Sequence, residues 1–275
     1  MIILVHGAWH GARHWDKVVE ALRALGKESI AIDLPGHGAR AQLGPGYLRG
    51  DADEFVTEPS LVAPVTVEEA ARSLLDTLYP LSSGRKPVVV GHSLGGPIVS
   101  RAAELEPEQF GHLVYVSGHV PIALGSPAAY AALPEWRTGY GEDLFVGDPA
   151  CTGVVRINPK GGNAYLERLR EAYYNDVPFD EFLPYAQALT PDLPLDFWIA
   201  QSRLSPERWG KIPRSYVRCL LDRALAPAIQ TRMIAEADAL TPENKFRVID
   251  LQSSHSPFLS QPQRLARELS NIPGS

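Results

Sequence analysis

The stretch VVVGHSLGG, residues 88–96, predicts a strand, a tight turn and the start of a helix. Its three valines are typical of a strand buried on both faces. Gly91, Ser93 and Gly95 form a Gly-x-Ser-x-Gly motif, and Pro97 suits the first turn of a helix. Such a turn lifts the serine above the carboxyl edge of a sheet, beside a helix N-terminus that favours an anion. Ser93 is the candidate nucleophile; the alternative is a glycine-rich turn with a surface serine.

The composition fits one large domain, or a domain with an insertion. The chain has 275 residues, of which 45% are hydrophobic, enough for a full core. The net charge is −6 and no basic run occurs, which argues against nucleic acid as a partner. Cys151 and Cys219 lie far apart, so neither a disulfide framework nor a metal site is expected, and a reducing compartment is favoured.

The first residues lead directly into a strand, without a basic segment or a cleavage site before them. No apolar stretch reaches the length of a membrane span. We therefore expect a cytoplasmic protein without a membrane partner. The sequence leaves the oligomeric state open, with a homodimer among the options.

Strands and helices alternate over much of the chain. The predicted strands span residues 1–5, 29–32, 88–90, 112–117, 215–221 and 246–251, and the predicted helices span residues 15–25, 66–81, 97–105, 227–238 and 262–269. This alternation predicts an α/β fold, with a mostly parallel six-stranded sheet and helices on both faces. Right-handed crossovers bring the carboxyl ends of all parallel strands to one edge, where ligands bind in such folds.

Two segments interrupt the alternation. Residues 39–64 are rich in Gly and Pro and show no period, which predicts a long loop. Residues 119–212 contain recurring prolines, short helical segments and more than half of the chain's aromatic residues. We interpret them as a helical cap, inserted into a core of residues 1–118 and 213–275 and covering an apolar pocket. The alternative is that the aromatic side chains form only the core of the cap.

A serine hydroxyl becomes a good nucleophile when a histidine removes its proton and a carboxylate orients that histidine. His255 follows the last predicted strand, and Asp222 ends the strand before it. The order Ser93, Asp222, His255 is the one expected for a Gly-x-Ser-x-Gly enzyme of this type. Another common position for the acid follows residues 112–117, but Ser117, Gly118 and His119 offer no carboxylate there. The alternative for His255 is a surface loop histidine, and the alternative for Asp222 is a helix-capping or loop aspartate.

The tetrahedral intermediate of acyl transfer needs two backbone N–H donors that point at its oxygen. Leu94 directly follows the nucleophile and supplies one. The loop after the first strand supplies the other, and we assign it to Ala8. We expect His6 to brace this loop through hydrogen bonds, and Asp33 and His37 to stabilise the turn after the second strand.

Several motifs carry a resemblance to a known family. They are VHGAWHG at residues 5–11 with its spacing to Trp15, Asp33-Leu34, GHSLGG at residues 91–96, Tyr216-Val217-Arg218-Cys219 with Asp222, and His255. Together they resemble the α/β-hydrolase superfamily, and within it the branch of plant methylesterases, hydroxynitrile lyases and bacterial pyrethroid-hydrolase-like esterases. The resemblance is weak through the cap and residues 39–64. It implies an α/β-hydrolase fold and a cofactor-free esterase, with Ser93, Asp222 and His255 as triad and Ala8 and Leu94 as oxyanion donors.

The predicted function is that of a serine hydrolase, which cleaves a carboxylic ester of a small apolar or aromatic substrate through an acyl-enzyme. The candidate substrate-binding residues are Trp9, His119, Trp136 and Trp198. A hydrogen-bonded loop histidine is the alternative for His119. Two other classes stay open: a lyase or natural-product-tailoring enzyme on the same scaffold, and a ligand-binding receptor that retains the triad.

Two positions argue against the lyase. In the related lyases, a threonine follows the histidine of the first loop and a lysine follows the catalytic histidine. Gly7 and Ser256 occupy these positions here. Gly7 leaves the oxyanion hole open, and Ser256 carries no charge to stabilise cyanide. We therefore expect ester hydrolysis without cyanide release.

Overall fold

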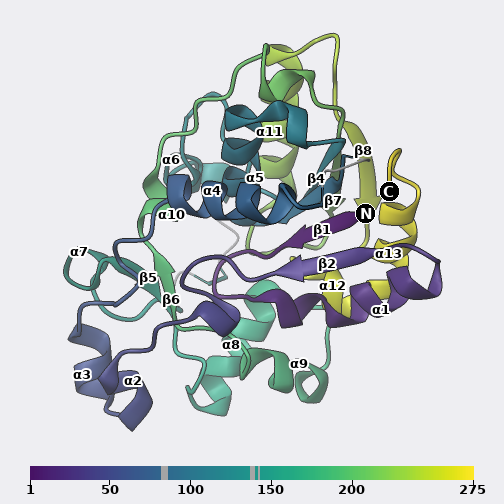
Figure 1. The fold of residues 1–275 in the computed structure, drawn as a ribbon. Coiled ribbons are helices and arrows are strands. Elements are labelled where there is room, and N and C mark those ends of the chain that lie inside the picture. The colour runs from purple at the N-terminus through teal and green to yellow at the C-terminus, as the bar shows by residue number, and fades with distance from the viewer. Residues whose placement is uncertain (82–85, 137–139, 142) are drawn as a thin grey trace.

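A six-stranded parallel sheet forms the centre of the computed structural model, which describes residues 1–81, 86–136, 140–141 and 143–275 (Figure 1). Its strands are β1 (Ile2–Val5), β2 (Ser29–Ile32), β3 (Val88–His92), β4 (His112–Val116), β7 (Arg214–Cys219) and β8 (Arg247–Leu251). They lie in the order β2-β1-β3-β4-β7-β8, and all neighbours pair in parallel. The predicted six-stranded sheet is confirmed.

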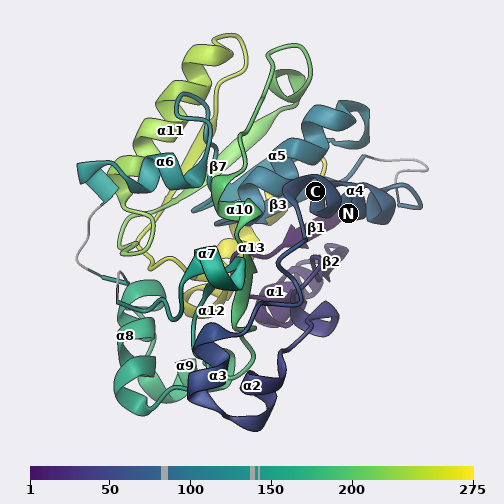
Figure 2. The same cartoon turned by 90° about the vertical axis from the view of Figure 1, so that its left-hand side faces the viewer.

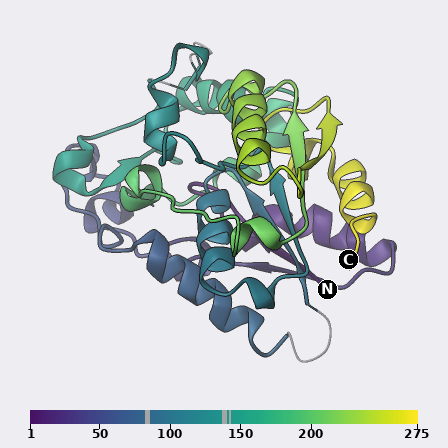
Figure 3. The same cartoon turned by 90° about the horizontal axis from the view of Figure 1, so that it is seen from above.

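Helices cover both faces of this sheet, as predicted. One face carries α4 (Val67–Leu78), α5 (Gly95–Leu105) and α11 (Pro227–Leu240); the other carries α1 (Asp16–Ala24), α12 (Pro257–Ser260) and α13 (Pro262–Ser270). The two termini lie side by side (Figure 3), so both ends of the chain build the same core. No helix in the described part of the chain combines the length and the apolar character needed to cross a membrane.

Burial differs between the central and the edge strands. Residues of β1, β3 and β4 are fully buried, as expected for strands covered on both faces. The edge strands β2 and β8 are partly exposed, and Ile30 and Val248 reach 39% and 41% exposure. The two edge strands are more exposed because one side of each strand has no neighbouring strand.

The segment between β4 and β7 packs over the carboxyl edge of the sheet (Figure 2). It contains α6 (Pro127–Ala131), α7 (Pro149–Thr152), β5 (Val154–Arg156), α8 (Asn163–Tyr173), α9 (Phe179–Ala186), β6 (Asp192–Pro194) and α10 (Asp196–Ile199). β5 and β6 pair as an antiparallel ribbon, so the segment is not purely helical. Three-residue strands are too short to show a period of two in the sequence. The domain boundaries at residues 118 and 213 stay a prediction.

Residues 39–64 are not one long loop. They contain α2 (Pro45–Arg49) and α3 (Ala52–Thr57), and Gly50, at φ +74°, ends the first of these helices. Asp51 caps the N-terminus of α3, where its side chain accepts from the Glu54 N–H. Helices of one turn leave no periodic signal in the sequence. Further short 3-10 helices lie at Ala12–Trp15, Gly38–Arg40, Pro107–Gln109, Pro134–Trp136 and Trp209–Lys211.

A buried ion pair attaches this segment to the β5–β6 ribbon. Arg156 Nε lies 2.6 Å from Asp192 Oδ1, and both side chains are at least nine-tenths buried. The same guanidinium donates to the carbonyl oxygen of Phe55, and Ser60 Oγ donates to Asp192 Oδ2 at 2.6 Å. Residues 39–64 are thus fixed to the segment between β4 and β7 by charge-assisted hydrogen bonds.

Candidate active site

Ser93 lies in a tight turn between β3 and α5. Its φ of +49° is unusual for a residue with a side chain. A Cβ atom on Gly95 would lie 2.5 Å from the His6 carbonyl oxygen, and one on Gly96 would lie 2.3 Å from the His119 carbonyl oxygen. The turn therefore requires glycine after the serine because two neighbouring loops pack directly against it.

The described residues other than glycine include three with positive φ: Trp9 at +61°, Ser93 at +49° and Ser117 at +43°. They follow β1, β3 and β4, the three adjacent strands in the middle of the sheet. Strained backbone persists where the surrounding structure enforces it, and it concentrates at functional sites. The carboxyl edge of these three strands is thus the most constrained part of the described backbone.

His255 and Asp222 meet at this edge. His255 Nδ1 lies 2.7 Å from Asp222 Oδ2, and both residues are buried. The other carboxylate oxygen, Oδ1, accepts from the N–H groups of Ala224 and Leu225, each at 2.8 Å. This arrangement orients the carboxylate and, through the bond to Nδ1, fixes which edge of the imidazole points toward the cavity.

Two further side chains hold the same carboxylate. Ser117 Oγ donates to Asp222 Oδ2 and lies 3.3 Å from His255 Nδ1. Gln230 Nε2, on α11, donates to the same oxygen at 3.2 Å. Neither role was predicted from the sequence. A glutamine among the apolar residues of the predicted helix was the available signal for Gln230. Ser117 was expected at the carboxyl edge of the sheet, because it ends a predicted strand, but without a role.

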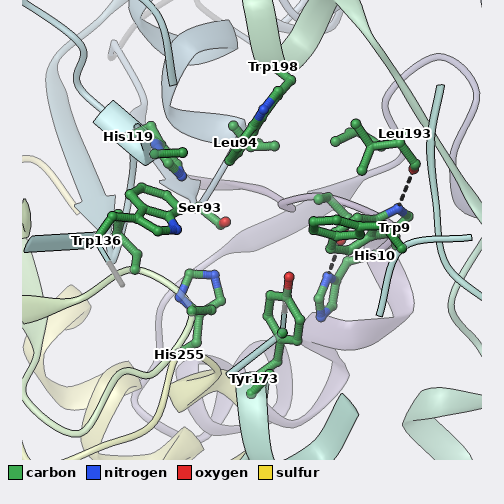
Figure 4. Close-up of a pocket in the computed structure, with 18 of the residues that line it drawn as sticks. Trp9, His10, Ser93, Leu94, His119, Trp136, Tyr173, Leu193, Trp198 and His255 are labelled. Carbon is green, nitrogen blue, oxygen red and sulfur yellow. Dashed lines mark hydrogen bonds between the residues drawn. The ribbon is translucent and has the colours of Figure 1, made fainter. Parts of the chain in front are cut away.

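Ser93 and His255 line one cavity of about 550 Å³ (Figure 4). Ala8 and Leu94 line the same cavity. In the described part of the chain, neither of their backbone N–H groups donates a hydrogen bond within the protein. Unpaired buried N–H groups are rare, and a pair beside a nucleophile suits a developing oxyanion.

Histidines hold the loop that carries Ala8. His6 Nδ1 donates to the Gly7 carbonyl oxygen at 2.8 Å, and its Nε2 accepts from the Leu34 N–H at 3.0 Å. Burial lowers the pKa of His6, which keeps the imidazole neutral and able to both donate and accept. The predicted bracing role of His6 is confirmed.

The predicted turn contacts are also present. Asp33 accepts from the N–H groups of Ala12 at 2.7 Å and Ala39 at 3.1 Å, and His37 Nδ1 donates to the Pro35 carbonyl oxygen at 3.1 Å. The bond from Ala12 joins the turn after β2 to the segment after β1, and the other two bonds lie within the turn.

Aromatic rings line the cavity on two sides of Ser93. His119, Trp136 and Trp198 lie together, with ring centroids 5.6 to 6.0 Å apart. Trp9 lies on the side of Ser93 away from His119 and Trp136 (Figure 4), where its ring contacts Phe145 and Tyr173. The remaining lining residues include His10, Ala131, Tyr140, Gly141, Pro149, Val155, Ala172, Leu193, Leu195, Ala224 and Leu225.

The four residues predicted to bind substrate all line this cavity. Tyr173, Phe145 and His10 were missed, although the density of aromatic residues in residues 119–212 was a signal for the first two. Trp9 is fixed by a hydrogen bond from its Nε1 to the Val155 carbonyl oxygen at 3.0 Å. Among the described lining residues there is no Asp, Glu, Lys or Arg.

A model of the alpha/beta hydrolase family matches residues 2–268. The chain belongs to this family. It is 30% identical to putative methylesterase 14, chloroplastic, of Arabidopsis thaliana, over 98% of this chain and 72% of that protein. It is 27% identical to the pyrethroid hydrolase of Sphingobium wenxiniae, over 98% of this chain and 86% of that protein.

A solved structure extends this similarity. The crystal structure of a pyrethroid hydrolase from Sphingobium faniae JZ-2 matches with a TM-score of 0.75 and 26% identity, covering 98% of this chain and 96% of that chain. The α/β-hydrolase fold and the branch to which the motifs pointed are thus confirmed.

Proposed function

We propose that the protein hydrolyses carboxylic esters through an acyl-enzyme on Ser93. His255 takes the proton of the Ser93 hydroxyl while the oxygen attacks the acyl carbon, and the Ala8 and Leu94 N–H groups bind the resulting oxyanion. The C–O bond to the alcohol then breaks as His255 returns the proton to the leaving oxygen. Water, deprotonated by His255, then attacks the acyl carbon; the bond to Ser93 Oγ breaks as His255 returns the proton to that oxygen, and the acid is released. Asp222 stabilises the imidazolium in both halves.

One observation carries this proposal: a single cavity contains the Ser93 hydroxyl, two N–H groups without an acceptor, and the imidazole held by Asp222. A nucleophile, an oxyanion site and an oriented base are the parts that acyl transfer requires. The relatives named methylesterase and pyrethroid hydrolase support an ester as the substrate.

We propose a small neutral ester with apolar or aromatic groups as the substrate. A cavity of about 550 Å³ without described charged lining residues would leave a charged substrate group unpaired, which costs free energy. Residues 119–212 contribute Trp136, Phe145, Tyr173 and Trp198 to the lining, so we propose that this segment acts as the cap that excludes water from the acyl-enzyme.

The test is a panel of p-nitrophenyl and methyl esters of graded size, scored by kcat/KM. Ser93→Ala should lower kcat by about 10⁴- to 10⁶-fold without loss of fold. Ser270→Ala, at the end of α13, removes a hydroxyl far from the cavity and serves as the control. A protein that binds these esters without turning over any of them would be a receptor and not an esterase.

The structure supports hydrolysis over the lyase reaction. A Cβ atom on Gly7 would lie 2.7 Å from Ser93 Cβ and 2.8 Å from His92 Nδ1, so the threonine of the related lyases does not fit this backbone. Ser256 is fully buried and uncharged. Mandelonitrile should therefore release no cyanide above the uncatalysed background. Rapid Ser93-dependent release, with no ester turned over, would reverse the assignment.

A further inference from the structure

His119 is fixed to the backbone of the nucleophile. Its N–H donates to the Ser93 carbonyl oxygen at 3.0 Å, and Gly96 packs so closely on its peptide that a Cβ atom there would clash. The positive φ of Ser117 turns the chain toward this contact. The position of the His119 ring relative to Ser93 is therefore set by backbone contacts and not by a flexible side chain alone.

The His119 ring lines the cavity beside two tryptophans. Its centroid lies 5.6 Å from that of Trp136 and 6.0 Å from that of Trp198, and the planes of the two indoles are 79° apart. In Figure 4, His119 and Trp136 lie on the side of Ser93 away from Trp9, and Trp198 lies above Ser93. We call His119, Trp136 and Trp198 the His119 cluster.

Both ring nitrogens of His119 lack a hydrogen-bond partner among the described residues. Nδ1 is fully buried and has none, and no hydrogen bond of Nε2 is present either. The imidazoles of His6 and His10, in the same region, use both nitrogens. His119 is only 2% exposed, and a buried polar group without a partner costs free energy. A partner from outside the protein would remove this cost.

The arrangement also indicates which nitrogen meets that partner. Burial lowers the pKa of His119 to about 3, so the ring is neutral and carries one N–H. Nδ1 has no accessible surface, whereas the ring as a whole lines the cavity, so Nε2 is the nitrogen that faces it. An unpaired buried N–H is rarer than an unpaired acceptor, which places the proton on Nε2.

We propose that His119 donates a hydrogen bond from Nε2 to a second polar atom of the substrate, apart from the reacting ester carbonyl. This inference rests on the proposed ester hydrolysis. The acceptor is an uncharged oxygen or nitrogen, such as an ether or carbonyl oxygen, on the substrate group that packs against the His119 cluster. The substrate class is thus a neutral ester whose aromatic group carries a hydrogen-bond acceptor, and His119 determines specificity for it without transferring a proton.

Matched esters that differ in one oxygen test this directly. Methyl 3-methoxybenzoate is compared with methyl 3-ethylbenzoate, and 3-methoxyphenyl acetate with 3-ethylphenyl acetate, so that the acceptor is placed on either half of the ester. In the wild-type protein, the methoxy member of at least one pair should have a kcat/KM about 10-fold higher or more, because its partner leaves the imidazole unpaired. His119→Phe should reduce this ratio to about 1, and His119→Gln should retain part of it.

Leu195→Ala is the matched control, because Leu195 lines the same cavity and its side chain carries no polar atom. It should alter both members of a pair alike. A ratio near 1 in both wild-type pairs, or a ratio that His119→Phe leaves in place, overturns the inference. If His119→Phe fails to fold, the wild-type ratios and His119→Gln still decide.

Binding to Ser93→Ala separates this inference from the proposed function. The dissociation constants of the same four esters are measured there by quenching of tryptophan fluorescence. If the wild-type protein hydrolyses no ester but Ser93→Ala binds the methoxy members more tightly through His119, the proposed function fails and the His119 site stands. If esters are hydrolysed and both members bind equally, only the His119 site is overturned.

Discussion

Asp222→Asn changes one atom of a carboxylate that accepts five hydrogen bonds. The Ala224 and Leu225 N–H groups bind Oδ1, and His255, Ser117 and Gln230 contact Oδ2. An amide has one NH₂ group, which must replace one of the two oxygens. Either orientation therefore turns at least two favourable contacts into contacts between donors.

The two orientations have different consequences. With the NH₂ group toward His255, Nδ1 must become an acceptor, the proton moves to Nε2, and kcat should fall by about 10⁴-fold, as for a wrong tautomer. With the NH₂ group toward Ala224 and Leu225, two buried N–H groups lose their acceptor, which costs about 1–3 kcal/mol each. In the first orientation the Ser117 hydroxyl can also rotate to accept, so only Gln230 Nε2 is left against another donor. This orientation keeps more of the free energy of folding, so we expect loss of activity in a folded protein.

The assay combines kcat on the best ester of the panel with the unfolding free energy from urea titration. Ser117→Ala is the matched control, since it removes one donor and keeps the carboxylate; kcat should fall by only about 3- to 30-fold. The double variant Ser93→Ala with Asp222→Asn should be no worse than Ser93→Ala alone. An Asp222→Asn protein with more than a tenth of wild-type kcat would refute the assignment of Asp222 as the acid.

Three further predictions concern the loop, the histidines and the buried ion pair. Gly7→Ala should lower kcat by about 10²-fold or more with little change in KM, because its Cβ would push Ser93 and His92 out of position; wild-type kcat would contradict this. Burial lowers the pKa of both His14 and His37 to about 4, so the unfolded chain binds protons between about pH 6.5 and 4 that the folded chain does not. The contribution of the two histidines to the free energy of unfolding should be complete above about pH 6.5, and that free energy should fall by roughly 1.4 kcal/mol per pH unit for each histidine as the pH decreases. A free energy of unfolding that stays constant from pH 7 to 5 would contradict this. Arg156→Met leaves Asp192 buried without its cation and should cost about 3–5 kcal/mol in urea unfolding; Arg156→Met with Asp192→Leu should recover much of this loss.

The central part of the fold could be predicted because its signals are local. The valines of β3, the glycines after Ser93 and the capping box of Thr66 and Glu69 each specify their own conformation within a few residues. The ribbon of β5 and β6 and the helices α2 and α3 were missed for the opposite reason. They are one turn or three residues long, and contacts such as Arg156 with Asp192, far away in the chain, hold them in place.

The residues of the candidate site also divide into those that the local sequence indicates and those that depend on contacts between distant elements. Ser93, Asp222 and His255 could be proposed from their positions after strands, because parallel strands share a carboxyl edge. Ser117 and Gln230 act on Asp222 through contacts across β4, β7 and α11, and sequence alone gives no register between those elements. The contribution of Tyr173 and Phe145 to the cavity depends on how the segment between β4 and β7 packs over the sheet, which aromatic content does not specify.

The central claim, that Ser93 is the nucleophile, is tested most directly by covalent labelling of its hydroxyl. The protein is treated with an activated aryl phosphonate of a size that fits the cavity, and the modified peptide is located by mass spectrometry after proteolysis. If Ser93 is the nucleophile, we expect one phosphonyl group per chain on Ser93, complete loss of ester turnover, and no labelling of Ser93→Ala. Labelling at another residue, or full ester turnover by a protein that is fully labelled on Ser93, would contradict this claim.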